Sequence, residues 1–168
     1  MKAKLIVEGK EFDIDILDPK LQELITPKKK TGYERVEQEK EFIFHRGDGN
    51  VFVGYDNHNE SCNNYFYYAN YYSDRTVAKN NIRADNLMRQ LRRFAVEHRK
   101  NEFCWDGKSS KYLIYYNHYH KCLSICSGGE GHQIYGTMYF DTAEEARLAI
   151  ETFRDELIWY FTEYKDSL

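Results

Sequence analysis

The chain has 168 residues, 42% of them hydrophobic, which suits one domain or two very small ones with a buried core. Its formal net charge of −3 gives no global reason to expect nucleic-acid binding, and no run approaches the ~18 apolar residues of a membrane span. Four cysteines without CxxC spacing, and an N-terminus without a signal-peptide core, indicate a cytoplasmic protein with reduced thiols.

Residues 1–30 are predicted to form a hairpin and a short helix. Apolar side chains alternate in 2–7 and again in 12–16, on either side of a turn that contains glycine. Asp18 and the proline after it are typical of a helix start, with Asp as the N-cap. A proline and three lysines at 27–30 make that stretch the best candidate for a linker.

Residues 31–168 are predicted to form an α+β domain of antiparallel β-sheets and two long helices. Alternating strands flank turns within 41–55 and within 111–128. The aromatic run at 65–72 and the segment 133–140 are each expected to extend a sheet before a long helix begins. The fold class predicted is therefore α+β, with the hairpin and short helix of the N-terminus added to it.

The two sets of strands align where each joins its helix. The aligned positions are Tyr72 to Asp74 with Phe140 to Thr142, Ala78 with Ala146, and Ile82 with Ile150. This pattern favours two related units, over 33–100 and 103–168. The alternative is that any joint between a strand and a helix carries an aromatic residue, a cap and a small residue. A duplication is thus one of two interpretations.

The first long helix, predicted over 74–100, has a net charge of +5, from eight Lys and Arg against three Asp and Glu. Its polar face would suit a nucleic acid, a nucleotide or an acidic protein. A solvated face, or one paired within the fold, is the plainer interpretation. The candidate phosphate-binding residues are Arg75, Lys79, Arg89, Arg93 and Lys100.

The final helix, predicted over 141–168, has a net charge of −5 and more apolar circumference than one sheet can cover. Ile158 and Trp159 lie outside its main apolar stripe, and Leu148 shares the side of Trp159. This second apolar face is expected to pack on the N-terminal segment or on another chain. The candidate partner-binding residues are Leu148, Ile158, Trp159, Glu144, Glu151 and Asp155.

The sequence contains no motif that names a reaction. The patterns GxSxG, GxxxxGK[ST], GxGxxG and HExxH are all missing, so we predict no enzyme, no catalytic residue and no cofactor. His118, His120, Cys122 and Cys126 are side chains of the types that bind zinc, but their spacing is not that of a zinc site, and no metal is predicted. The tyrosines of 65–72 would stack bases only on an open sheet face.

Three stretches carry a resemblance to a known group: NYYSDRTVAKNN at 70–81, LMRQLRRFAVEHRK at 87–100 and GTMYFDTAEEARLAIETFRDELIWYFTEY at 136–164. Together they resemble a group of small proteins encoded by phages and prophages of Firmicutes. The resemblance covers about residues 65–168, and it transfers no catalytic residue because the group has no general assigned chemistry.

The resemblance implies a context. Small phage proteins without enzyme motifs act by binding, and some inhibit host defences as anti-CRISPR proteins do. We therefore expect a non-enzymatic accessory protein that binds a host or phage protein, with a host defence nuclease as one candidate, in the cytoplasm of a bacterial host. The alternative is a nucleic-acid or nucleotide-binding module that uses the basic helix, and a homodimer is compatible with either.

Overall fold

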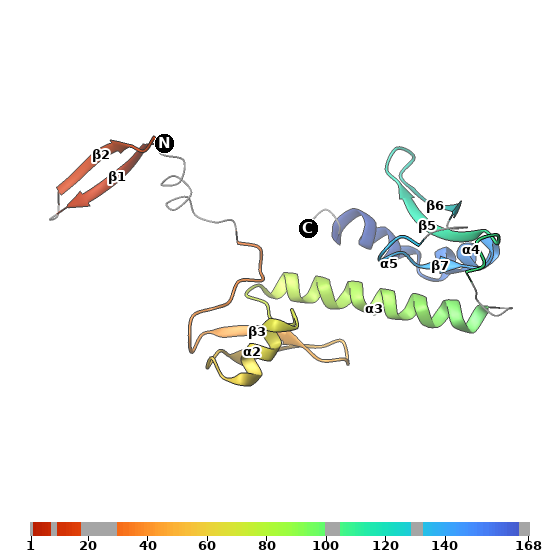
Figure 1. Cartoon of the computed structure of the whole chain (residues 1–168), viewed down its shortest axis with the longest axis horizontal. Coiled ribbons are helices and arrows are strands. Elements are labelled where there is room, and N and C mark those ends of the chain that lie inside the picture. Colours follow the sequence, from red (N-terminus) through yellow and green to blue (C-terminus); the bar gives the residue numbers. More distant parts are fainter. Residues whose placement is uncertain (1, 8–9, 18–29, 100–104, 129–132, 165–168) are drawn as a thin grey trace.

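The computed structural model describes residues 2–7, 10–17, 30–99, 105–128 and 133–164. The fold is α+β, with antiparallel β-sheets and helices, as the sequence predicts (Figure 1). The predicted helix at Asp18 and the turn at 129–132 lie outside the described residues. No helix among the described residues combines the length and the apolar composition that crossing a membrane requires.

The predicted N-terminal hairpin is confirmed. Strands β1 (Lys2–Val7) and β2 (Lys10–Asp15) pair antiparallel. Lys4 and Glu11 form an exposed ion pair across the two strands, with 2.6 Å between Nζ and Oε2. Among the described strands, β1 and β2 pair only with each other, so they form a sheet of their own.

A second hairpin, also as predicted, forms the base of the first unit. Strands β3 (Glu41–His45) and β4 (Val51–Tyr55) pair antiparallel, with Phe44 opposite Phe52. Phe42 is buried and stacks on the ring of Tyr71, with 4.3 Å between the ring centroids. Gly54 makes room for this packing, because a Cβ at that position would lie 2.8 Å from the Phe42 ring.

The aromatic run that was expected to form a strand begins instead as helix α2 (Glu60–Tyr67). Asn59 caps this helix by accepting a hydrogen bond from the backbone N–H of Cys62, at 2.9 Å. Cys62 and Tyr65, three residues apart, pack on the aromatic core, while Tyr67 is 80% exposed. The expectation of a strand was wrong because local capping and a helical spacing outweighed the β-propensity of tyrosine.

Helix α3 (Arg75–His98) ends the first unit and lies between the part that contains β3 and α2 and the second unit (Figure 1). Asp74 caps it, as predicted, by accepting hydrogen bonds from the backbone N–H groups of Thr76 and Val77 at 2.7 and 2.9 Å. The helix contacts β3 and β4 of the first unit and the helices of the second. Its buried residues are Ala78, Ile82, Ala84, Leu87, Leu91, Phe94 and Ala95.

The second unit has a three-stranded sheet in the order β6-β5-β7. The hairpin of β5 (Lys111–Asn117) and β6 (Cys122–Gly128) is confirmed. The strand expected over 133–140 is reduced to β7 (Tyr139–Phe140). A turn replaces the rest, in which Gly136 has a φ of +75° and the N–H of Thr137 donates to the carbonyl of Ile134 at 3.2 Å. A left-handed residue of this kind is incompatible with a continuous strand.

The final helix is not continuous, contrary to the prediction. It consists of α4 (Ala143–Thr152), α5 (Arg154–Trp159) and the π-helical turn η1 (Tyr160–Tyr164), with a break at Phe153, where φ is −116° and ψ is 24°. Thr142 caps α4 by accepting from the Glu145 N–H, and the Glu145 carboxylate accepts from the N–H of Asp141, the residue before the cap, rather than from the N–H of the cap itself as in a full capping box. The Phe153 ring packs edge-on against Phe94, so the break directs it into the core.

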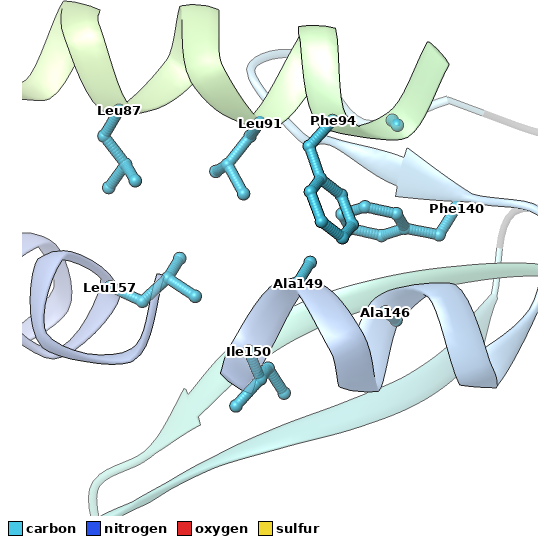
Figure 2. Packing of buried hydrophobic residues seen from close by; sticks show 9 residues of the cluster. Leu87, Leu91, Phe94, Phe140, Ala146, Ala149, Ile150 and Leu157 are labelled. Carbon is cyan, nitrogen blue, oxygen red and sulfur yellow. The ribbon is translucent and has the colours of Figure 1, made fainter. Parts of the chain in front are cut away.

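The main hydrophobic core lies between α3, α4, α5 and β7 (Figure 2). Leu87, Leu91 and Phe94 point from α3 toward Ala149 of α4 and Leu157 of α5. Ala146 and Ala149 are fully buried, and their small side chains let α3 and the sheet approach α4 closely. Each buried leucine contributes about 1.5–3 kcal/mol by removal of apolar surface from water.

The two units resemble each other where the long helix begins. Tyr72 forms an isolated bridge to Ile43 of β3, β7 pairs with β5, and the N-cap of the helix follows two residues after Tyr72 and two residues after Phe140. Ala78 and Ala146, which the sequence aligns, are both 0% exposed. These common features fit the predicted pair of related units, but a duplication of the sequence itself stays a prediction.

Candidate functional site

Trp159 is buried within the molecule, so it is not exposed for the contact with a partner that the sequence suggested. Its side chain is 6% exposed, the guanidinium of Arg83 lies 3.9 Å from its ring centroid, and Tyr164 packs 5.6 Å away. The second apolar face of the final helix is thus covered in part by α3, whereas the sequence suggested the N-terminal segment or another chain. Ile158 is half-buried, so the predicted pair does not form a bare apolar patch.

The break at Phe153 explains why Leu148 and Trp159 do not share one side of the final helix, as the sequence predicted. On one continuous helix, Leu148 and Trp159 would share a side, because eleven residues make about three turns. The break changes the course of the chain between α4 and α5. As a result Trp159 is buried, whereas Leu148 is 42% exposed.

An ion pair joins the basic helix to the acidic one. Arg83 of α3 donates to Glu156 of α5 through Nε at 2.8 Å and Nη2 at 3.0 Å. Glu156 raises the pKa of Arg83, chiefly through the side-chain hydrogen bond. Both side chains are 43% exposed, so the pair contributes at most about 1 kcal/mol. The opposite charges of the two helices therefore meet within the molecule at this point, and the pair fixes their orientation more than it stabilises the fold.

An acidic face remains on α4 and at the start of α5. It consists of Glu144, Leu148, Glu151 and Asp155, all of which are exposed. The first three lie on one side of α4, because their spacing of four and then three residues follows the helical period. Glu144 forms only a long ion pair, with 3.9 Å between its Oε1 and Nη1 of Arg147. The face thus presents carboxylates around one apolar side chain.

A basic face runs along the solvent side of α3. It consists of Arg75, Lys79, Arg89 and Arg93, all of which are exposed, whereas Lys100 lies outside the described residues. Arg75 and Arg93 are five helical turns apart, or about 27 Å at 1.5 Å per residue. Arg93 is 3.6 Å from Glu97. Within the described ranges, Arg75 and Lys79 have no ion-pair partner, so part of this face is free to bind an anion.

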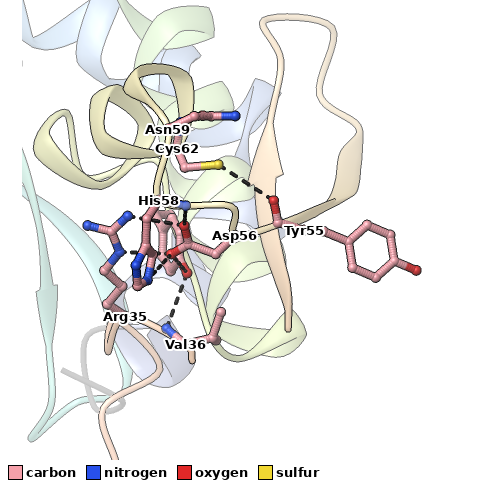
Figure 3. Close-up of polar contacts among 8 residues, drawn as sticks. Arg35, Val36, Tyr55, Asp56, His58, Asn59 and Cys62 are labelled. Atoms are coloured by element: carbon pink, nitrogen blue, oxygen red, sulfur yellow. Dashed lines mark hydrogen bonds and ion pairs between the residues drawn. The ribbon is translucent and has the colours of Figure 1, made fainter. Parts of the chain in front are cut away.

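A buried carboxylate, which the sequence analysis missed, forms the centre of the first unit (Figure 3). Asp56 is fully buried and accepts hydrogen bonds from Arg35 Nε at 2.8 Å and Nη2 at 3.1 Å. The Tyr71 hydroxyl and the His58 backbone N–H also donate to it, each at 2.8 Å. The Arg35 guanidinium holds the pKa of Asp56 well below its usual range.

The polar groups of this cluster hydrogen-bond one another. Burial raises the pKa of Tyr71 to about 12, so its hydroxyl stays protonated and donates to Asp56 while it accepts from the Val36 N–H. Cys62 donates to the carbonyl of Tyr55 at 3.5 Å. Each of these polar groups is occupied by a neighbour, and together they hold the segment around Arg35 on the first unit.

A cavity of about 770 Å³ lies where residues 30–37 pass the start of α3. Glu34 accepts hydrogen bonds there from Gly32 N–H at 3.0 Å and from Ser73 Oγ at 2.9 Å. Hydrogen bonds from the backbone at Thr31 lower the pKa of Glu34 to about 2. The lining mixes both signs of charge with neutral polar groups, so it specifies no single ligand class.

The zinc-type residues do not form a site. Asn117 Oδ1 accepts hydrogen bonds from the N–H groups of Tyr119 and His120, both at 3.0 Å, so the histidines lie in a turn. Cys122 and Cys126 are exposed on β6. The described part of the chain has no group of three or more His, Cys, Asp or Glu side chains placed to hold a metal ion.

Comparison with known proteins assigns no family. No protein-family model, curated protein or solved structure matched the chain. The function must therefore be inferred from the charged faces and from the contacts that surround them.

Proposed function

We propose that the protein acts without catalysis, by binding another protein through its acidic face. The observation that supports this most is Leu148, which is 42% exposed on α4 between the exposed carboxylates of Glu144 and Glu151. The opposite side of α4 is fixed in the core by Ala146 and Ala149, which are both fully buried. The face is thus presented on a rigid helix, as helix-in-groove recognition requires.

The chemistry of the face defines the partner. Carboxylates around an apolar side chain complement a basic groove that contains an apolar pocket, and the charges would speed association and select the partner. A protein channel that holds nucleic acid has such a basic lining. We therefore favour a host defence nuclease as the partner class, consistent with the resemblance of the sequence to phage-encoded proteins.

Charge reversal on the face tests this proposal. A variant with Glu144→Lys and Glu151→Lys should lose a partner that the wild-type protein captures from a host lysate and that then binds as a purified protein. A matched control, Glu37→Lys with Glu60→Lys, reverses two exposed acids elsewhere and should keep that partner. Leu148→Asp should lose it as well. Equal recovery of every protein by all four forms would refute the assignment of the acidic face.

The basic face supports a second candidate, binding of nucleic acid or a nucleotide. The observation in its favour is that Arg75 and Lys79 are exposed and have no ion-pair partner in the described part of the chain. Binding of labelled oligonucleotide should then weaken steeply with salt, and Arg75→Gln with Lys79→Gln should reduce the slope of log K against log salt by about 1–2. Failure of the wild-type protein to bind any oligonucleotide at low salt would exclude this candidate.

A further inference from the structure

The outer edge of β6 has no partner strand. The sheet order is β6-β5-β7, and no described strand pairs with the far side of β6. The strand is seven residues long and carries no charged residue and no proline. Sheet edges are ordinarily protected by charges, prolines or bulges, because an open edge offers backbone N–H and C=O groups to another strand. Here those protections are missing.

The sequence of β6 is chemically palindromic. Cys122-Leu123-Ser124-Ile125-Cys126 reads Cys, aliphatic, Ser, aliphatic, Cys in either direction. When two such strands pair antiparallel about Ser124, Cys122 of each copy lies opposite Cys126 of the other. Leu123 likewise lies opposite Ile125, so chemically similar side chains meet at every position.

The two faces of the strand also match under this pairing. Leu123 and Ile125 pack against the hydrophobic core below α4, whereas Cys122 and Cys126 are exposed on the other face of the sheet. A two-fold axis through Ser124 keeps each side chain on its own face. Aliphatic residues then meet beside the two cores, and thiols meet on the open face, as an isologous contact requires.

We propose that β6 pairs with β6 of a second copy of this chain, antiparallel and centred on Ser124, which joins two three-stranded sheets into one. A strand from an unrelated protein could also form hydrogen bonds with the backbone of this edge. The palindromic order of side chains, however, is matched only when the second strand is another copy of β6. The self-complementary order of side chains is what selects a second copy. This inference does not depend on the acidic face or on the proposed function.

Exchange of single thiols tests the register. Directly opposed residues in an antiparallel pair have Cα atoms about 4.5–5.5 Å apart, within the range that a disulfide spans. With Cys104 replaced by serine throughout, the Cys122→Ser and Cys126→Ser variants should each give no disulfide-linked dimer on mild oxidation with diamide, which takes up the two electrons and two protons. A mixture of the two variants should give one, because Cys126 of the first lies opposite Cys122 of the second.

A linked dimer of either variant alone would place identical thiols opposite each other, which would refute the register centred on Ser124. A mixture that gives no linked dimer would refute the pairing itself. Cys62 is buried, so it does not complicate the comparison.

The contact without a disulfide is tested under reducing conditions. Sedimentation should show a monomer–dimer equilibrium for the wild-type protein, and Ser124→Lys, which places two like charges opposite each other at the two-fold axis, should weaken it about tenfold or more. The matched control is Tyr115→Lys, at the position on β5 that pairs with Ser124, and it should dimerise normally. A wild-type protein that stays monomeric at every concentration tested, or equal effects of the two lysines, would overturn the proposal. Unchanged thermal unfolding of both variants excludes a defect in folding.

Discussion

The two predicted units, 33–100 and 103–168, differ in the interactions that hold them together. The first unit surrounds a buried carboxylate, Asp56, with aromatic rings and the guanidinium of Arg35. The second surrounds small and aliphatic side chains, such as Ala149 and Leu157, with α3 and a sheet. A hairpin followed by a capped helix therefore does not determine the chemistry of its core, because a buried carboxylate is accommodated where each polar group finds a partner.

The largest expected effect lies in the apolar unit. Leu91→Ala should lower the free energy of unfolding by about 3–5 kcal/mol, because Leu91 is buried at the centre of the packing between α3 and α4. The control, Val96→Ala on the same helix, removes a side chain that is 66% exposed and should change the value by less than about 0.5 kcal/mol. Urea denaturation followed by circular dichroism measures both. Equal values for the two variants would mean that α3 does not pack on α4 as described.

The polar unit should respond most strongly to loss of its carboxylate. Asp56→Ala should cost about 2–3 kcal/mol, because it leaves the hydroxyl of Tyr71, the N–H of His58 and part of the Arg35 guanidinium without an acceptor. The same denaturation experiment applies, with Glu37→Ala as an exposed control. A cost below about 0.5 kcal/mol would show that the network does not hold the first unit together.

Two glycines in strands, one in each unit, are expected to respond differently to the same substitution. Gly54→Ala should destabilise the protein by about 1–2 kcal/mol, because the added Cβ would lie 2.8 Å from the ring of Phe42. Gly128→Ala adds the same atom where no atom of the described residues lies within 4 Å, and it should be nearly neutral. Thermal unfolding of the two variants compares them directly, and a reversed order would contradict the packing of the first unit.

The smallest expected effect is a dependence on acid pH that belongs to the first unit. Asp56 and Glu34 have pKa values below those of the unfolded chain, Glu34 at about 2. Their contribution is therefore complete above the unfolded pKa values of about 4 and is lost as the pH falls through the folded ones. Asp56→Asn should flatten the loss of stability below about pH 4. An identical acid profile for the variant and the wild-type protein would contradict the role of Asp56.

Much of the fold is encoded locally and could be predicted. Alternating apolar residues around turns identified the three hairpins that the described residues form, and short polar side chains identified the starts of α3 and α4 at Asp74 and Thr142. The helix α2 was missed because its tyrosines favour strands when taken by themselves. The break at Phe153 was missed because no glycine or proline marks it; the ring of Phe94, distant in sequence, packs there instead.

The candidate site likewise has features that the sequence predicts and features that depend on contacts between residues distant in sequence. The exposure of Glu144 and Glu151 on α4 follows from the helical period, which the sequence contains. The burial of Trp159 depends on Arg83, seventy-six residues earlier, and could not be read from the final helix. The Asp56 network joins Arg35, Asp56 and Tyr71 from three separate stretches of the chain, and no sequence spacing predicts such a cluster.

Helix α3 covers part of the second apolar face of the final helices, whereas the charged side of α4 stays exposed, where we propose that a partner binds. The most direct test is quenching of Trp159 fluorescence by acrylamide in a Trp105→Phe variant, in which Trp159 is the sole tryptophan. We predict weak quenching in the native protein, close to that of a buried indole, and stronger quenching when Arg83→Ala removes the cover. Quenching of native Trp159 as strong as that of the unfolded chain would contradict the account.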